Sequence, residues 1–222
     1  YIIELVGNVT IDLVDLAGHD FNIINNTITV EKYILTNDSG RGVIQLQSGN
    51  SGTDNYGGIM TIANNTITVG NQAAIDKSVQ PISYTLQKVL DEGLIINNNT
   101  IKNGNVDSRK TNLAIQIIGK FKLLEITNNV LNSCILISSP NGISEVKRLN
   151  ISGNKIYDSP RGGIMILGGT SNNEYITIEK NNNKLQVAGI YISPPTNQQG
   201  GVTIVTGNSV INSGLDGSGS SE

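Results

Sequence analysis

The chain has 222 residues, of which 37% are hydrophobic and 15% charged, and its formal net charge is −3. This weakly acidic balance, without a basic patch, argues against nucleic acid as a partner. No apolar run reaches the roughly 18 residues that a membrane-spanning helix needs, so we expect no membrane insertion, and the single cysteine, Cys134, excludes an intrachain disulfide.

The chain divides into three parts on its sequence pattern. Residues 1–19 are expected to form an entry coil or cap, because Val9–Val14 has the alternation of a strand. Residues 20–213 carry an internal repeat and are expected to form the main domain. Residues 214–222 are rich in Gly and Ser, which predicts a flexible tail. Because the chain begins at Tyr1 rather than Met, we expect it to be part of a longer protein.

The repeat is a six-residue phrase: apolar, two residues, Asn, one residue, apolar. Successive anchor asparagines lie from about 39 to about 25 residues apart, which is a spacing typical of solenoids. Another copy surrounds Asn181–Asn183, where two or more registers fit. The remaining copies are Ile23–Ile28, Ile62–Ile67, Ile96–Ile101, Ile126–Leu131, Ile151–Ile156 and, more loosely, Val205–Val210.

A second, glycine-marked strand with strict alternation follows most copies of this phrase. Strands this short cannot bury a face alone, but they can when coils stack on one another. Val79–Leu90 interrupts the pattern, and the surrounding segment Ile75–Asp91 is the one place where a short helix is an alternative, although Pro81 argues against a long one. The alternating strands are Val43–Leu46, Ile115–Ile117, Ile135–Ile137, Ile164–Ile166 and Ile190–Ile192.

Asparagine suits the turn between two strands for two reasons. It adopts the left-handed backbone conformation more readily than most residues. Its side-chain amide both donates and accepts, so that one copy in each coil can hydrogen-bond to the copy in the next coil. The sequence therefore predicts an asparagine ladder along the stacked coils.

These features resemble the right-handed parallel β-helix superfamily, which has the pectate-lyase-like fold. Gly153–Ile156 followed by Gly162–Ile166 is close to the coil pattern of that superfamily. The resemblance implies an all-β, single-stranded, right-handed parallel β-helix (a solenoid) of about seven coils. The superfamily contains lyases, glycosidases, epimerases, phage tailspikes and adhesins, so the resemblance leaves the function open.

On the glycine-marked strands, Ile is expected to point inward and the intervening residue outward. The resulting outward column contains no carboxylate, which argues against the catalytic pattern expected of pectate-lyase-like enzymes. Its later part is apolar, which suggests contact with a sugar or another chain, unless loops of the same chain cover it. The column consists of Gln45, Gln116, Leu136, Met165 and Tyr191.

The loops before these strands carry acid–base pairs, which would line one groove of a solenoid. Polysaccharide lyases use a basic residue beside a carboxylate, whereas glycosidases use two carboxylates; the alternative is solvated surface charge. Our candidate catalytic residues are Asp107, Asp158 and Arg161. The candidate substrate-binding residues are Asp38, Arg41, Arg109, Gln116, Met165 and Tyr191.

Two further patterns carry less weight. His19 beside Asp20 is interpreted as a turn, since the flanking residues do not extend a catalytic match, and no metal-ligand spacing stands out, so we expect neither metal nor cofactor. The acceptor sequences for N-glycosylation at Asn25, Asn64, Asn98 and Asn150 are interpreted as a by-product of an Asn/Thr-rich repeat.

The leading hypothesis is a β-helix module of a phage tailspike or similar appendage that binds, and in one version degrades, cell-surface polysaccharide. We expect a homotrimer located outside the cell or on a virion surface. One alternative is a secreted polysaccharide lyase or glycoside hydrolase, and another is a bacterial surface adhesin. Whether the chain is an enzyme stays open at this stage.

Overall fold

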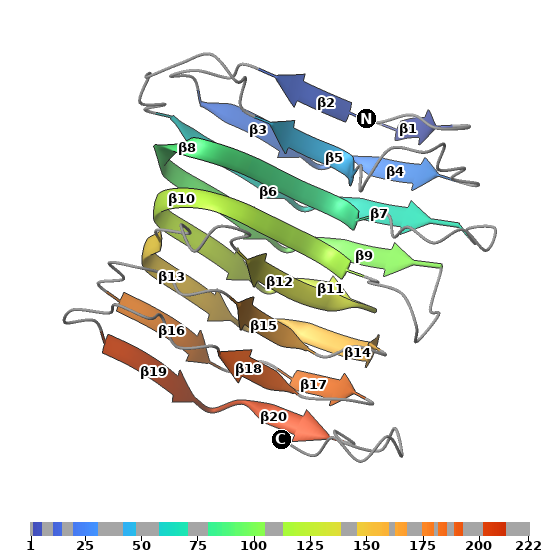
Figure 1. The fold of residues 1–222 in the computed structure, drawn as a ribbon. Coiled ribbons are helices and arrows are strands. Elements are labelled where there is room, and N and C mark those ends of the chain that lie inside the picture. Colours follow the sequence, from blue (N-terminus) through green and yellow to red (C-terminus); the bar gives the residue numbers. More distant parts are fainter. Residues whose placement is uncertain are drawn as a thin grey trace.

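The structure is a computed structural model in which all described regular structure is β-strand. Every strand pairs in parallel with a strand from an earlier or later part of the chain, and the strands stack from β2 and β3 down to β19 and β20 (Figure 1). The described residues are 2–5, 11–14, 20–30, 42–47, 58–70, 80–104, 113–138, 146–159, 163–167, 175–179, 182–185, 189–192 and 202–211.

The predicted all-β, parallel arrangement is confirmed, and it is consistent with a parallel β-helix. The chain passes repeatedly through three faces. Face 1, an eight-stranded sheet, follows the asparagine turns and contains β1 (Ile2–Leu5), β4 (Thr27–Val30), β7 (Thr66–Val69), β9 (Thr100–Asn103), β11 (Val130–Leu131), β14 (Lys155–Ser159), β17 (Asn182–Leu185) and β20 (Ser209–Ile211).

The other two faces belong to a single twelve-stranded sheet. Face 2 contains β2 (Ile11–Val14), β5 (Gly42–Gln47), the first parts of β8 (Gln80–Asn97) and β10 (Leu113–Thr127), β12 (Cys134–Ser138), β15 (Ile164–Leu167) and β18 (Ile190–Ile192). Face 3 precedes the turns and contains β3 (Phe21–Ile24), β6 (Ile59–Ala63), the last parts of β8 and β10, β13 (Val146–Ser152), β16 (Tyr175–Glu179) and β19 (Val202–Thr206).

Strands β8 and β10 connect faces 2 and 3 without a break. The start of β8 pairs with β5, whereas its end pairs with β6. The helix considered for Ile75–Asp91 is therefore wrong from Gln80 onward, where the chain is a strand. Pro81 is accommodated as the second residue of this strand, close to the start position that proline tolerates in sheets.

Within residues 1–19, which are predicted to form an entry coil or cap, β1 pairs with β4 and β2 pairs with β5. The tail 214–222 lies outside the described residues, and the three-part division of the chain stays a prediction.

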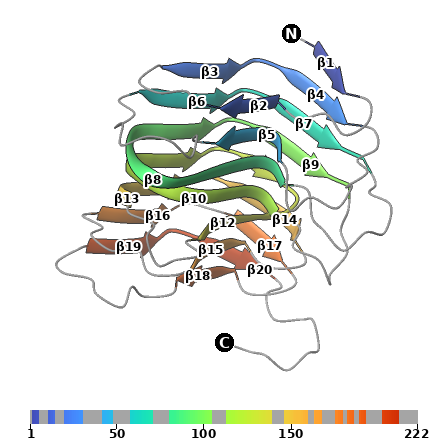
Figure 2. The same cartoon turned by 45° about the horizontal axis from the view of Figure 1, so that its top comes forward.

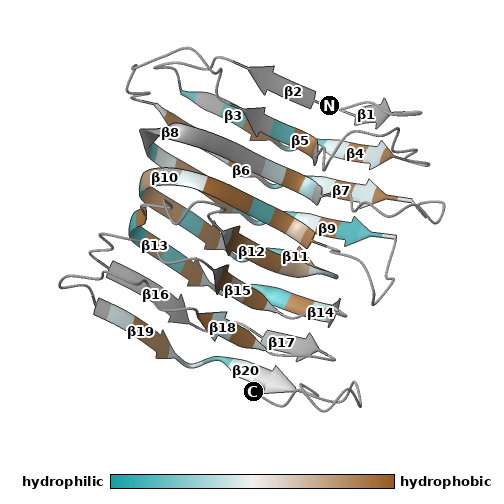
Figure 3. Cartoon of the chain, viewed as in Figure 1, coloured by the Kyte–Doolittle hydropathy of each residue, from teal (hydrophilic) through white to brown (hydrophobic). Residues whose placement is uncertain are grey.

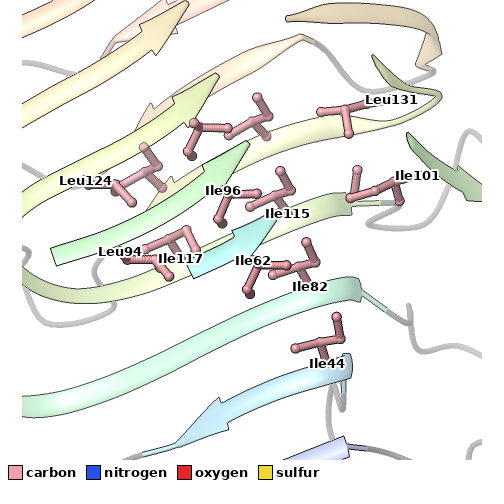
Figure 4. Packing of buried hydrophobic residues seen from close by; sticks show 14 of the residues in the cluster. Ile44, Ile62, Ile82, Leu94, Ile96, Ile101, Ile115, Ile117, Leu124 and Leu131 are labelled. Atoms are coloured by element: carbon pink, nitrogen blue, oxygen red, sulfur yellow. The ribbon is translucent and has the colours of Figure 1, made fainter. Parts of the chain in front are cut away.

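The interior of the stack is aliphatic because each face contributes inward columns of apolar side chains, and on each face one of these columns consists of Ile, with a single Leu on face 1. Ile44, Ile82 and Ile115 lie one above another in Figure 4, since the strands that carry them are in register. Full burial of one such side chain contributes roughly 1.5–3 kcal/mol, and only when neighbouring coils are in place. The buried members of the three columns are Ile44, Ile82, Ile115, Ile135 and Ile164; Ile23, Ile62, Ile96, Ile126 and Ile151; and Ile28, Ile67, Ile101, Leu131 and Ile156.

The sequence predicts that one asparagine in each turn both adopts the left-handed conformation and hydrogen-bonds to the next coil. In the turn between face 3 and face 1, two successive residues share these roles. The residue before the anchor has the left-handed conformation, as at Asn64 (φ 56°) and Asn98 (φ 55°). Glycine takes this place in two later turns, as Gly153 (φ 67°) and Gly207 (φ 61°). An added Cβ at Gly153 would overlap Oδ1 of Asn128, so the side chain of one turn lies directly over the glycine of the next.

The anchor asparagines form a second set, which points inward. Their side chains are joined from coil to coil: Nδ2 of each donates to Oδ1 of the next at 3.0 Å. The backbone N–H of each anchor donates to the same Oδ1, at 2.9–3.0 Å. We call this set the asparagine column; it comprises Asn26, Asn65, Asn99, Asn129 and Asn154, all of which are buried.

Each internal member of the asparagine column has its hydrogen-bonding capacity satisfied. For Asn99, Oδ1 accepts from the backbone and side chain of Asn65, while Nδ2 donates to Asn129 and to the carbonyl oxygen of Ile62. Farther along the stack, Asn182 pairs with Lys155, the residue that follows the anchor Asn154, and this pairing gives the register of β17. Asn181 lies outside the described residues.

Replacement of Asn99 by Ala should destabilise the protein strongly. Four buried groups would each lose a partner, and an unsatisfied buried group costs about 1–3 kcal/mol, so we expect the free energy of unfolding to fall by at least about 3 kcal/mol. The measurement is urea denaturation. The matched control is Asn98→Gly, which removes the adjacent exposed amide and keeps a residue that tolerates positive φ; its cost should stay within about 1 kcal/mol. Equal losses for the two variants would contradict the assignment.

Candidate functional site

The outward column predicted for face 2 is present as a stack in register. Its neighbouring members are aligned strand by strand, with Gln116 opposite Leu136, Leu136 opposite Met165 and Met165 opposite Tyr191. The structure therefore brings Gln116, Met165 and Tyr191 together on one face. The register adds an acidic residue to the predicted column, at Asp12, whose side chain lies outside what the structure describes, so the expectation of a column without a carboxylate is wrong at that position. The full set of aligned positions is Asp12, Gln45, Ser83, Gln116, Leu136, Met165 and Tyr191.

The expectation that this whole column is exposed is wrong. Leu136 is only 8% exposed and Gln45 only 5%. Leu136 points away from the main core but packs in a second apolar cluster with Leu113 and Cys134, against which Met165 also packs. Of the two alternatives, the covered stripe holds for Leu136, and Cys134 is buried as a thiol within the same cluster. Tyr191, at the end of the column, is 44% exposed and open to a ligand, whereas Gln116 and Met165 are partly exposed.

Most residues of the predicted acid–base groove lie outside the residues that the structure describes. Asp158 belongs to strand β14, but its side chain is outside what the structure describes. Asp20 is described, and its Oδ1 accepts a hydrogen bond from the backbone N–H of Ile59 at 3.0 Å; this contact joins β6 to the residue before β3. The residues of the predicted groove that lie outside the described ranges are Asp38, Arg41, Asp107, Arg109 and Arg161.

Face 3 carries a surface that the sequence analysis missed. In one outward column, Ile59 lies opposite Gly93, followed by Leu123 and Arg148. In the next column, Thr61 and Ile95 are followed by Glu125 and Asn150. Figure 3 shows hydrophobic and hydrophilic segments alternating along β10 and β13. We call the surface formed by Ile59, Ile95, Leu123, Glu125 and Arg148 the face 3 patch.

The face 3 patch combines apolar and charged groups at fixed positions. Ile59 is 43% exposed. A Cβ added at Gly93 would lie 3.6 Å from Cβ of Leu123 and 3.8 Å from Cγ1 of Ile59, which are ordinary contacts. Since Gly93 has no such atom, the surface has room for about one methyl group between the two side chains. An ion pair between Lys122 and Glu92 adds charge on β8 and β10.

This arrangement is suited to recognition of a sugar. Ile59 and Leu123 offer apolar contacts to a ring face, and the carboxylate of Glu125 and the guanidinium of Arg148 offer charge-assisted hydrogen bonds. Glu125 and Arg148 come from adjacent strands and are diagonal neighbours, because Leu123 is opposite Arg148 and Asn150 is opposite Glu125. The alternation of inward and outward residues also holds in the strands before each turn, and it is the signal that could have revealed these residues. The outward positions were predicted only for the glycine-marked strands.

Two searches of the described residues were negative. No group of three or more His, Cys, Asp or Glu side chains within them could hold a metal ion. The described part of the chain also contains no helix with the length and apolarity needed to cross a bilayer.

Comparison with known proteins gave no relative: no family model, no curated protein and no solved structure matches this chain.

The position of Leu136 leads to a stability prediction. Leu136→Ala should lower the free energy of unfolding by about 2–5 kcal/mol, as expected for a buried leucine. Tyr191→Ala, at the exposed end of the same column, should cost less than about 1 kcal/mol. Urea denaturation of both variants measures the difference. A cost for Leu136→Ala no larger than that for Tyr191→Ala would mean that Leu136 is open to solvent.

Proposed function

We propose that this chain is a polysaccharide-binding β-helix module of a phage tailspike or appendage-like protein. The observation that carries the proposal is the face 3 patch, where apolar and charged side chains of β6, β8, β10 and β13 stand in register on one outward surface. Parallel strands repeat at about 4.8 Å, so a stack of coils offers similar groups at regular steps, which suits a polymer of repeating sugars.

The proposal includes a finer description of the fold. The three faces would form one right-handed, single-stranded β-helix of about seven coils, with the asparagine column as a continuous ladder. The direct bonds from Asn26 to Asn154 support the ladder, and the eight strands of face 1 support a coil number near the expected one.

The proposed ligand of the face 3 patch is an acidic cell-surface polysaccharide. Arg148 is exposed and would pair with a sugar carboxylate or sulfate, since a guanidinium binds such groups with two parallel hydrogen bonds. Ile59 and Leu123 would contact the ring. Tyr191, at the open end of the face 2 column, would be a separate contact; Met165 is its neighbour in that column, and Gln116 lies farther along it, beyond Leu136.

The module is further proposed to be a homotrimer displayed outside the cell or on a virion. Ile24, which is 38% exposed on face 3 and lies outside the face 3 patch, supports a contact between copies, because exposed apolar groups can mark interaction surfaces. The same architecture would serve a bacterial surface adhesin.

A polysaccharide lyase or hydrolase is the second candidate function. The pairing of an acidic and a basic group, Glu125 and Arg148, on adjacent strands favours it. Asp107, Asp158 and Arg161 stay candidate catalytic residues; Asp158 belongs to β14, and the other two lie outside the described residues. Incubation with acidic glycans, followed by detection of unsaturated products or new reducing ends, would separate an enzyme from a binding module.

Binding of acidic polysaccharides tests the leading proposal. Arg148→Ala should weaken binding about tenfold or more, since a hydrogen bond to a charged group contributes about 1.5–3 kcal/mol. The matched control is Lys155→Ala, which removes one positive charge from an exposed position on face 1 and should leave the affinity unchanged. Isothermal titration against a panel of bacterial capsular and O-antigen polysaccharides is the measurement. A wild-type protein that binds no member of the panel would refute the proposal.

A further inference from the structure

A set of polar side chains lies at the start of face 1, away from the face 3 patch. Figure 2 shows β4, β7 and β9 side by side, and they are paired in register. Their first residues, Thr27, Thr66 and Thr100, are all exposed and aligned with one another. We call these three threonines, together with the exposed asparagines of the preceding turns, the Thr/Asn array; the asparagines are Asn25, Asn64 and Asn98.

The fold does not require these residue types. In later turns the position of the threonine is occupied by Val130 and then by Lys155, which pair in the same column. The position of the left-handed asparagine is occupied by Gly153 in one turn. The fold therefore tolerates Val or Lys at the threonine position and Gly at the asparagine position. Folding alone does not explain why both positions are polar in the first three coils.

The backbone of the array and the β-branched side chains of its threonines are rigid. On one side of each turn, Asn64 N–H donates to the carbonyl oxygen of Asn97 at 3.0 Å and Asn98 N–H to that of Thr127 at 3.1 Å. On the other side, Thr100 N–H donates to the carbonyl oxygen of Asn65 at 2.8 Å. The buried asparagine column runs between the exposed asparagines and the threonines of the array. Threonine itself has few rotamers. Groups held in this way lose little conformational entropy when a ligand binds.

The chemistry of the array selects one class of partner. Hydroxyl and amide groups both donate and accept hydrogen bonds, as the hydroxyl groups of a sugar do. The array carries no charged side chain, and Lys102 is the nearest cation along β9, whereas nucleic acid needs several cations and an acidic glycan needs a cation to pair with its charged group. The array also has no exposed apolar side chain, and the centre of a protein–protein interface would need one.

We propose that the Thr/Asn array binds a neutral, extended β-linked glycan whose chain runs along the stack, with about one sugar residue for each coil. A pyranose ring in such a chain advances the polymer by close to the strand spacing of about 4.8 Å. Each ring therefore meets one threonine hydroxyl and one asparagine amide. This inference rests on the proposed polysaccharide binding for the type of ligand, but it concerns a separate surface and an uncharged substrate.

The test uses cellohexaose, a neutral β-1,4-linked probe, and the acidic polysaccharide identified with the face 3 patch. The first variant combines Thr27→Val, Thr66→Val and Thr100→Val, which removes three hydroxyls and keeps the branched shape. The second combines Asn64→Gly with Asn98→Gly, which removes two amides at positions where glycine adopts the required positive φ. The control is Thr61→Val on face 3, and urea denaturation confirms that each variant is folded.

The expected result is at least tenfold weaker binding of cellohexaose by both array variants, with Thr61→Val unchanged and binding of the acidic polysaccharide unaffected by all three. Wild-type protein that binds the acidic polysaccharide but not cellohexaose would overturn this inference and leave the proposed function intact. Binding of cellohexaose that is unchanged in the array variants, or equally weakened in Thr61→Val, would overturn it as well. Wild-type protein that binds neither glycan would refute both proposals.

Discussion

The hydrogen bonds between stacked asparagine amides are the constraint on which this structure depends. A buried amide without partners would destabilise the fold. In the column, each internal asparagine obtains its partners only from the coils on either side, as Asn99 does from Asn65 and Asn129. No coil can therefore satisfy its own turn alone. The amide bonds also fix the register of the faces, since a shift by one residue would direct the asparagine outward and an exposed neighbour inward.

The separation of the left-handed residue from the buried asparagine explains how one part of the turn can vary while the other is fixed by folding. The buried residue is asparagine in every described turn from Asn26 to Asn154, because its amide must both donate and accept. The preceding residue needs only a positive φ, and both Asn128 (φ 56°) and Gly153 (φ 67°) provide it. Outward positions are freer still. The core and the asparagine column therefore hold the outward columns at regular spacing, and these columns are where we propose that ligands bind.

Sequence periodicity gave the strand content and the direction of side chains relative to the core. It predicted that Ile164 and Ile166 point inward and Met165 outward, and their burial agrees. It failed for β8, because a local pattern does not show that a strand continues through a corner between two faces. It also failed for Leu136, because alternation tells which way a side chain points but not what packs over it from outside.

The candidate site was harder to predict than the fold. The face 3 patch brings together residues such as Ile59, Leu123 and Arg148, which are far apart in the chain and adjacent only after the coils stack. Coil lengths differ along this chain, so a fixed period does not align such residues from sequence. The register of the paired strands shows which residues are adjacent. It thereby defines a surface on which ligand binding can be tested.

Hydrogen exchange of side-chain amides, measured by NMR, tests the central claim most directly. The Nδ2 protons of Asn65, Asn99 and Asn129 should exchange orders of magnitude more slowly than those of the neighbouring Asn64 and Asn98, because only the first set is buried and bonded between coils. Equally fast exchange of the two sets would contradict the account.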